Sequence, residues 1–557
     1  MRFPALILCV LALALRVPPA GAADASTSPA ALPSIAEASP AALPSFAELE
    51  AAGARIGEIR VDTENIFDTA DPKENKLLFR WANRLHVRTQ PDVIRRALLF
   101  KSGEPLSARL IEETERVLNG KRYLYEVTIR PVAWHDGVVD IEVKTRDTWT
   151  LDIGASAGRS GGANTSGLSI SEYNVLGTGV SMGYGRSNEL DRSSNEFLIS
   201  NDRAFDGWTT LSFSTAQNSD GRRDAASVMR PFNALDARWA AGATALRDDR
   251  IDSVYNAGDI VNQYRHRQRR AEVFGGWSAG LVEGWARRWS VGLTLLDDSY
   301  RFETGRIAPA RLPRDEKLVA PFVRYELLED HYQRLQNRDL IAQPEFFALG
   351  TTSTVQLGWA STALGSSHDA LLYSGTLSRG YEPAPQHTLI TSASIAGEFT
   401  EGHVWRQQVG AQVRYYRPQG KRSLFYATAS ADMLTHPDVL DMLLLGGDNG
   451  LRGYPLRYQS GTRRALFTAE ERVYSDWYVW QLFRVGAAAF ADVGRAWGGD
   501  HVNTVDPGWL GDVGIGLRIV SARAAFSNVL HVDLAFPLNA QGDVKKVQLL
   551  VKTKASF

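Results

Sequence analysis

Thiols and long apolar stretches are scarce in this 557-residue sequence. The one cysteine, Cys9, lies in a segment with the pattern of a secretory signal, because Arg2 is basic, Ala5–Leu15 is apolar and Ala20–Ala22 offers small residues for cleavage. Removal of residues 1–22 would leave no thiol, which excludes disulfide scaffolds and cysteine-ligated metals. A helical membrane span needs about 20 apolar residues, and no other run approaches that length. Any membrane span of the mature chain is therefore expected to be a strand.

Excess charge of one sign and enzyme motifs are also lacking. The formal net charge of -1 at pH 7 gives no electrostatic case for a nucleic-acid partner. The sequence has no His-Glu-x-x-His motif, no P-loop and no cluster of Cys and His, so no metal, nucleotide or other cofactor is predicted. Ser156 and Ser278 each lie in a Gly-x-Ser-x-Gly match, but neither precedes a predicted helix as a lipase nucleophile would. The sequence therefore predicts a protein that is not an enzyme.

Residues 23–54 are rich in Ala, Ser and Pro and repeat one phrase, in Ser28–Glu37 and again in Ser39–Glu48. This composition predicts a linker. The alternative is a docking peptide that uses Ile35 and Phe46, and no other feature of the sequence supports it.

Residues 55–147 change between strand and helix periods in the order β-α-α-β-β. A first strand around Ile56–Val61 precedes an insertion at residues 64–84. A helix follows, at whose start Thr89-Gln-Pro-Asp92 resembles a capping box with its proline in the first turn. The segment is thus predicted to form a small mixed domain.

The second half of this domain contains another helix and a hairpin. Ser107 is predicted to cap the helix, and Asp136-Gly137 is predicted to join strands at Tyr123–Pro131 and Val138–Thr145. Such a sheet has an edge that could accept an extended peptide by main-chain pairing. It could equally serve as a passive spacer, and the sequence leaves both roles open.

Residues 148–557 show no helical period, and segments with period two recur along them. Apolar and polar residues alternate in Trp289–Leu295, in Val409–Tyr416 and in Leu530–Phe536, as in strands with one apolar face. A soluble antiparallel sheet would show the same alternation. The signal segment, the lack of helices and an alternating last segment that ends at Phe557 favour a closed, antiparallel transmembrane β-barrel.

The connections indicate strand number and orientation. Short connections at Val175–Gly179, Asn233–Asp236 and Val282–Trp285 are interpreted as periplasmic turns. Longer polar segments at Arg247–Val261 and Thr304–Lys317 are interpreted as surface loops. The resulting count is nearer twenty strands than sixteen, and an even number places both ends of the barrel in the periplasm.

A basic run, Tyr264–Arg270, follows the first of these predicted surface loops. It contains four arginines and one histidine. The run is interpreted as a solvated rim, with lipopolysaccharide phosphates as the alternative partner.

A group of glycine, charged and aromatic residues lies near the end of the sequence. It begins in a connection that contains Gly446, Gly447 and the tripeptide Arg452-Gly453-Tyr454. Two predicted strands follow. Alternation places Glu470 and Arg472 on one wall of the first strand, and Phe490, Asp492 and Gly494 on one face of the second.

This ordered set resembles the motifs of the BamA/TamA-type outer-membrane superfamily, and the domain at residues 55–147 resembles a single POTRA module. The resemblance runs from about residue 55 to the end of the chain. It implies a surface-antigen-type barrel of sixteen strands whose connection folds back into the lumen with Arg452 at its tip. It also implies that Glu470 and Asp492 receive this arginine.

Physical chemistry supports this pairing independently. A guanidinium inside a barrel is partly desolvated and needs carboxylates that match its planar fork. Gly453 and Gly494 would permit close approach of backbones. Arg452 could act only as a brace of the barrel or could have a direct role in transport, and the sequence leaves both open.

The resemblance implies an outer-membrane protein that assists insertion of proteins into the membrane or translocation of polypeptides across it. Expected partners are an unfolded polypeptide client, outer-membrane lipid and lipopolysaccharide, and accessory lipoproteins or periplasmic chaperones, and the barrel is expected to be monomeric. Weak pairing between the first strand, near Trp149–Gly158, and the last, near Val547–Phe557, would expose edges that template incoming strands. The alternative is a passive pore or structural surface barrel without polypeptide clients. The chain has room for one POTRA module where relatives have two or more, so its client stays open.

Overall fold

The structure is a computed structural model that describes residues 43–205, 207–480, 482–499, 507–521, 529–539 and 544–554. The chain divides into two units, Met1–Pro44 and Ser45–Phe557. The predicted signal at residues 1–22, most of the predicted linker and the terminal Phe557 lie outside the described residues. The predicted domain boundaries therefore stay predictions.

The larger unit begins with a small α/β segment around a three-stranded sheet. Its sheet has the order β1-β3-β2, in which β1 pairs parallel to β3 and β2 pairs antiparallel to it. The predicted β-α-α-β-β order is present, with two extra helices: α3 inside the insertion, and α2 before β1, where the sequence predicted a linker. The elements are α2 (Phe46–Ala51), β1 (Arg55–Glu64), α3 (Leu77–Leu85), α4 (Pro91–Arg95), α5 (Ala108–Asn119), β2 (Leu124–His135) and β3 (Val138–Asp147).

One face of this sheet supplies the core. Every second residue of β3 is buried, and these side chains pack with apolar residues of the helices, such as Ile94, Ile111 and Leu118. The hairpin between β2 and β3 turns at Asp136 and Gly137, which have φ values of 51° and 75°. Positive φ at both positions is what a tight hairpin turn requires, so the predicted turn is confirmed.

The predicted helix caps are wrong in detail. Gln90, not Thr89, is the N-cap of α4, because the Thr89 hydroxyl instead donates to Asp147 Oδ1 at 2.8 Å. Asp147 is fully buried. A buried carboxylate without hydrogen-bond donors costs more free energy than a helix start without a side-chain cap. Ser107 occupies the N-cap of α5 without a side-chain cap bond. Pro91 lies in the first turn of α4 as predicted.

Among the described residues, no helix combines the length and the apolar character needed to cross a membrane.

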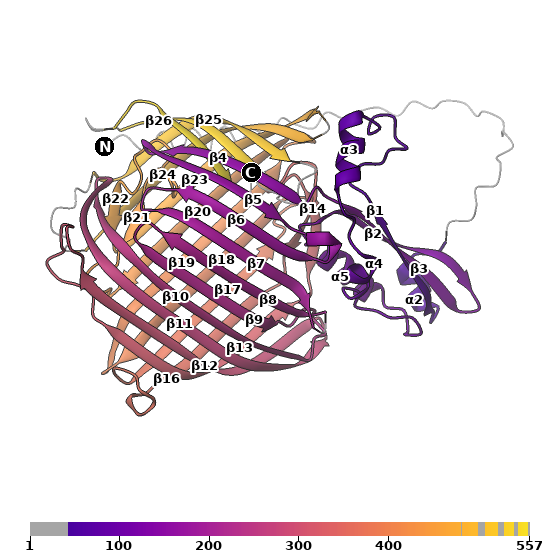
Figure 1. The fold of residues 1–557 in the computed structure, drawn as a ribbon, viewed down its shortest axis with the longest axis horizontal. Helices are drawn as coiled ribbons and strands as arrows, with labels where there is room; N and C mark the ends of the chain where they lie inside the picture. The colour runs from indigo at the N-terminus through magenta and orange to yellow at the C-terminus, as the bar shows by residue number, and fades with distance from the viewer. Residues whose placement is uncertain are drawn as a thin grey trace. The chain divides into compact units, whose positions relative to one another are not determined.

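Twenty described strands form one closed antiparallel barrel (Figure 1). This agrees with the count from the connections and not with the sixteen strands implied by the resemblance. The barrel strands are β4 (Leu151–Ser160), β5 (Ala163–Glu172), β6 (Val180–Asn188), β7 (Ser193–Ala204), β8 (Thr209–Asn218), β9 (Gly221–Arg230), β10 (Trp239–Asn256), β11 (Asp259–Val282), β12 (Trp285–Phe302), β13 (Glu316–Glu329), β16 (Thr352–Ala360), β17 (Ala370–Tyr381), β18 (Thr388–Thr400), β19 (His403–Pro418), β20 (Ser423–Thr435), β23 (Arg463–Val479), β24 (Phe483–Trp497), β25 (Leu510–Ser521), β26 (Val529–Pro537) and β27 (Gln548–Lys554).

Two short hairpins lie within connections of the barrel. The hairpin of β14 (Tyr332–Gln336) and β15 (Pro344–Ala348) falls between β13 and β16. The pair of β21 (Leu443–Leu445) and β22 (Gln459–Gly461) falls between β20 and β23. We refer to residues 436–462, which contain the second pair, as the lumen loop.

The strands are apolar outside and polar inside. In β12, the side chains of Trp289, Val291 and Leu293 are exposed, whereas those of Ser290 and Thr294 are buried. The same alternation recurs in β26, where Leu534 is exposed and Asp533 is buried. An outward apolar face around a polar interior is the pattern of a transmembrane barrel.

The ring closes where the last strand meets the first (Figure 1). In the described residues, the register between β27 and β4 is given by the single pair Val551–Arg159. The register between β26 and β27 instead continues from Val529–Lys554 to Ala535–Gln548. The barrel is thus closed between its last and first strands.

One predicted surface loop is wrong. Residues 247–256 belong to β10, and β11 begins at Asp259, so the connection is a tight turn at Ala257 and Gly258. The charged residues looked like a loop because they lie on both faces of long strands that pair across the hairpin. The other predicted loop is confirmed, since β12 ends at Phe302 and β13 begins at Glu316.

The basic run Tyr264–Arg270 consequently lies within β11. Arg265 pairs with Asp249 and Glu303, and His266 contacts Asp298. Acidic residues of the neighbouring strands therefore balance much of the positive charge. The sequence interpretation placed this run in a solvated rim after a loop. In the structure it is instead a strand segment whose basic side chains pair with acidic ones.

We expect substitution of Asp147 by Asn to loosen the α/β segment. His86 Nε2 and the Thr89 amide both donate to Asp147 Oδ2, at 2.8 and 2.7 Å, and an amide nitrogen at that position could not accept from both. Leaving a buried donor without an acceptor costs about 1–3 kcal/mol. Hydrogen exchange of the full-length protein should show a matching loss of protection in α4 and β3.

The matched control is Asp62→Asn, because Asp62 is an exposed carboxylate of β1. The control should leave exchange unchanged. Equal protection in Asp147→Asn and in the unmodified protein would show that this carboxylate does not hold the segment together.

Candidate functional site in the barrel lumen

The lumen loop folds back on itself near its base. The amide of Gly447 donates to the Pro455 carbonyl at 3.0 Å, and the amide of Leu451 donates to the Gly446 carbonyl at 3.1 Å. A Cβ on Gly446 would lie 2.3 Å from the Pro455 oxygen, and a Cβ on Gly447 would lie 2.6 Å from the Tyr454 oxygen. Both glycines are therefore required by the close approach of the two arms of the loop.

The tip of the loop places Arg452 against the barrel wall. Its Nε and Nη2 donate to the two carboxylate oxygens of Asp492 at 2.7 and 2.9 Å, and its Nη1 donates to Glu470 Oε1 at 2.8 Å. The guanidinium carbon lies 3.4 Å from the centre of the Phe490 ring. Only 6% of Arg452 is exposed, so this is a buried, bidentate and stacked arginine.

The next two residues of the tip bind β25 and its neighbourhood. The Gly453 amide donates to Asp512 Oδ2 at 3.0 Å, and a Cβ at this position would lie 2.6 Å from the Cβ of Asp512. The Tyr454 hydroxyl lies 3.0 Å from the Gly511 carbonyl oxygen and 2.7 Å from Asn539 Oδ1. The tripeptide is thus fixed to β23, β24 and β25 at the same time.

Further side chains hold the carboxylates in place. The Thr468 hydroxyl donates to Asp492 Oδ1 at 2.7 Å, and Arg472 Nε donates to Glu470 Oε2 at 2.9 Å. Arg472 Nη1 also donates to the Arg338 carbonyl at 2.8 Å. The acceptors of Arg452 are therefore oriented by their own donors.

The last strands add charges that the sequence analysis did not assign to the site. Arg518 pairs with Asp533, and Asp533 Oδ2 also lies 3.8 Å from Arg452 Nη1. All of these groups are almost fully buried. The alternation of apolar residues in β26 placed Asp533 on the inner face, which is the signal that could have identified it.

The structure brings the predicted site residues together. Gly494 lies under the loop, since a Cβ there would be 3.0 Å from Leu445 Cδ2. The residues gathered around the tip are Arg452, Gly453, Tyr454, Glu470, Arg472, Phe490, Asp492 and Gly494, with Gly446 and Gly447 at the base of the loop. Phe557 lies outside the described residues.

The loop also contacts both strands of the closing junction. Ser160 of β4 donates to the Gly447 carbonyl at 2.8 Å. Lys552 of β27 donates through Nζ to the Asp448 carbonyl at 2.6 Å. Consecutive carbonyls of the loop therefore join the first and last strands from inside the barrel.

Of the two serines in the lipase-like matches, the structure describes the side chain of Ser278. Ser278 donates to the Arg287 carbonyl at 2.8 Å, and the side chain of Ser156 is not among those described. The arrangement at the lumen loop can hold or release a connection. It contains charged pairs and backbone contacts in place of an open reaction centre.

No protein-family model matches the chain, and no curated protein matches it. Among solved structures, BamA from Haemophilus ducreyi lacking POTRA domains 1-3 is 13% identical over 90% of this chain and 85% of that chain, with a TM-score of 0.40. CdiB from Acinetobacter baumannii is 13% identical over 90% of this chain and 73% of that chain, with a TM-score of 0.42. CdiB from Escherichia coli is 14% identical over 90% of this chain and 76% of that chain, with a TM-score of 0.45.

Identities of 13–14% assign no client and no partner to this chain. The geometry of its own lumen loop and junction therefore has to support any function.

We expect Arg452→Ala to release the tip of the lumen loop. Removal of the guanidinium leaves Asp492 and Glu470 buried without their main cation, and breaking a buried pair in this way costs about 3–5 kcal/mol. Hydrogen exchange and limited proteolysis of the folded protein should show the loss of protection within residues 436–462, with the barrel strands still protected.

Arg463→Ala is the matched control, because Arg463 lies at the start of β23 with an exposed side chain. It should leave the loop protected. A loop that stays equally resistant in Arg452→Ala would contradict the role of this arginine as its anchor.

Proposed function

We propose that this protein is an outer-membrane factor that inserts proteins into the membrane or translocates polypeptides across it, with its N-terminal α/β segment in the periplasm. The observation that carries the proposal is the junction between β27 and β4. The barrel closes there, and one loop inside the lumen contacts both strands. If the strand edges separate at this junction, they can template an incoming strand.

The lumen loop supports the proposal because it controls this junction from inside. Its Gly447 and Asp448 carbonyls accept from Ser160 of β4 and Lys552 of β27. The loop is in turn anchored by Arg452 on β23 and β24. Release of the anchor would therefore remove both bridges across the junction in one movement.

The α/β segment offers a place for an extended client. In the sheet order β1-β3-β2, strand β2 lies at an edge, and edge strands can accept peptides by main-chain pairing. Pro131 lacks an amide hydrogen, which leaves Leu124–Arg130 as the more suitable part of this edge. Templating by strand edges needs neither a nucleotide nor a catalytic residue, so we propose no enzymatic activity.

A passive pore is the second candidate, and one observation favours it. The lumen contains a cavity of about 620 Å³ whose lining includes the charged residues Glu272, Glu398 and Arg406 beside apolar ones. Such a cavity could conduct small solutes if the loop moved. A pore, however, gives no reason for the loop to bridge the first and last strands.

We expect a disulfide across the junction to abolish activity. Cysteines at Arg159 and Val551 would face each other on β4 and β27, and the rest of the chain after residue 22 has no cysteine. Cells depleted of the protein would be complemented with Arg159→Cys/Val551→Cys, and the outer-membrane and secreted proteins would be quantified by mass spectrometry. The oxidised form should fail to restore the lost client, and reductant should rescue it.

The control disulfide joins Leu534→Cys to Leu549→Cys, a pair within the continuous ladder of β26 and β27. It should leave function intact. Full activity of the locked β27–β4 junction would reject the gate. An unchanged proteome on depletion, together with large steady conductance in planar bilayers, would instead favour the passive pore.

A further inference from the structure

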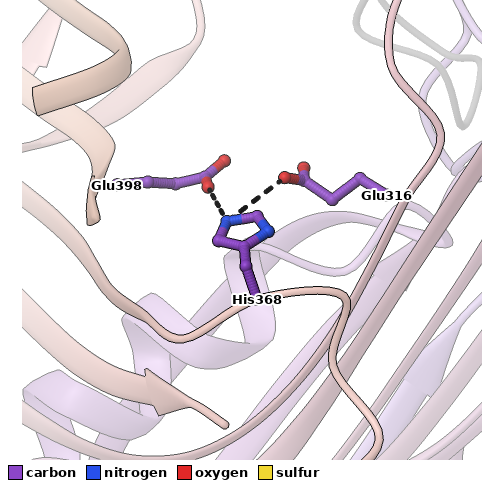
Figure 2. Close-up of side chains that lie close together, drawn as sticks. All are labelled: Glu316, His368 and Glu398. Atoms are coloured by element: carbon purple, nitrogen blue, oxygen red, sulfur yellow. Dashed lines mark ion pairs between the residues drawn. The ribbon is translucent and has the colours of Figure 1, made fainter. Parts of the chain in front are cut away.

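Three potential metal ligands converge from separate parts of the barrel. Glu316 is the first residue of β13, His368 lies in the connection between β16 and β17, and Glu398 lies near the end of β18. Figure 2 shows the two carboxylates on either side of one nitrogen of the His368 ring. His368 Nε2 lies 3.7 Å from Glu316 Oε1 and 3.6 Å from Glu398 Oε2.

These distances suit two ligands of one ion better than a direct hydrogen bond. Zinc binds nitrogen and oxygen ligands at about 2.0–2.2 Å, which places two ligand atoms of a tetrahedral site about 3.4 Å apart. One ligand atom from each of the three residues lies within 4.8 Å of the others. Small side-chain adjustments would bring all three to an ion between them.

The polar atoms of the cluster need a partner. Both ring nitrogens of His368 and Glu398 Oε2 are buried and form no hydrogen bond with the described residues. Glu398 itself is only 8% exposed. Buried polar groups are normally satisfied by a donor, an acceptor, a water or an ion, and a carboxylate and an imidazole that converge on one point suit an ion.

The charges around the cluster also favour a cation. Arg406 Nη1 donates to Glu316 Oε2 at 3.0 Å, and its Nε lies 3.5 Å from Asp441. Arg406 is thus shared between two carboxylates and leaves Glu316 Oε1 directed at His368. With a neutral histidine, the two glutamates keep excess negative charge that a dication would offset.

We propose that Glu316, His368 and Glu398 form a site for a divalent transition-metal ion of the zinc type. An imidazole nitrogen beside two carboxylates suits zinc, whereas calcium and magnesium prefer oxygen ligands alone. A neighbouring cavity of about 330 Å³ contains Glu316, His368 and also His403, and it leaves room for water as a further ligand. The ion would tie the connection at residues 361–369 to the barrel wall.

The experiment uses purified full-length protein without a histidine tag, treated with chelator and titrated with zinc chloride in a calorimeter. We expect one zinc ion per folded barrel. His368→Ala and Glu398→Gln should each weaken binding by about tenfold or more, whereas His135→Ala, at an exposed histidine of β2, should not. X-ray absorption should show mixed nitrogen and oxygen ligands at about 2.0 Å.

Folding of each variant is checked by its heat-dependent mobility in gels. Less than one zinc ion per folded wild-type barrel would overturn the proposal. Equal zinc affinity in folded His368→Ala and in the wild type would also overturn it. In that case His368 would only interact with the two glutamates through its charge, and it would not be a metal ligand.

A second inference rests on α3, a helix with an exposed apolar face. Leu77, Leu78, Trp81 and Leu85 are all exposed, and their spacing places them on one side of the helix. The other side is anchored by Phe79, which stacks on Phe67 with ring centres 4.2 Å apart. Nothing in the core of the α/β segment covers the exposed face.

This apolar face continues onto the barrel. Leu78, Trp81 and Leu85 line one apolar cavity together with Trp149 and Phe483. Trp149 lies two residues before the start of β4, and Phe483 begins β24. The apolar face of α3 therefore lies next to the starts of β4 and β24, two strands of a barrel whose outer surface is apolar.

We infer that α3 lies in the membrane interface and that phospholipid covers its apolar face. An amphipathic helix with tryptophan and leucine on one side and basic residues flanking them is suited to this position. Arg80 and Arg84 provide the basic residues and are exposed. The helix would hold the α/β segment against the leaflet that the proposed function places on the periplasmic side.

The test places an environment-sensitive fluorophore on Leu78→Cys in nanodiscs of phosphatidylethanolamine and phosphatidylglycerol. Spin-labelled lipid should quench this probe several-fold more than aqueous iodide does. The same probe on Arg80→Cys, an exposed position almost opposite Leu78 around the helix, should show the reverse preference. Equal access of iodide to both positions would overturn the inference, and it would leave the junction proposal untouched.

Discussion

Burial of the Arg452 guanidinium is the constraint on which the rest of the lumen depends. A charge with 6% exposure is tolerated only when it is paired and hydrogen-bonded. Asp492 and Glu470 satisfy it, and they can do so because β23 and β24 pair in a register that sets Thr468 opposite Asp492. The position of the loop, the orientation of the carboxylates and the glycines beneath them all follow from this pairing.

The same loop relates the anchor to the closing junction. Strands β23 to β26 carry the acidic residues of the site, and β27 and β4 follow them in the ring. The hydrogen bonds from Ser160 and Lys552 end on neighbouring loop carbonyls. The loop anchored by Arg452 thereby also holds the two strands at which the barrel closes, and this link is the physical basis of the proposed gate.

The sequence predicted what depends on local period and on the ordered motifs. Alternation identified the barrel strands, and the positions of Glu470 and Asp492 followed from the motifs. The prediction of a surface loop at Arg247–Val261 was wrong, because charged residues outside the apolar belt have the same pattern in strands as in loops. The prediction that Thr89 caps a helix was wrong, because a local capping pattern gives no information about the distant, buried Asp147 that Thr89 contacts instead. Glu316, His368 and Glu398 could not be grouped from the sequence, because their proximity depends on how the neighbouring strands β13, β16, β17 and β18 pair, which local period does not give.

The most direct test of the central claim is a cryo-electron-microscopy map of the full-length protein in a lipid nanodisc. We expect a closed ring in which the Arg452 side chain reaches Asp492 and Glu470 inside the lumen, with the loop carbonyls next to Ser160 and Lys552. A map with the loop tip in solvent, away from both carboxylates, would contradict the account.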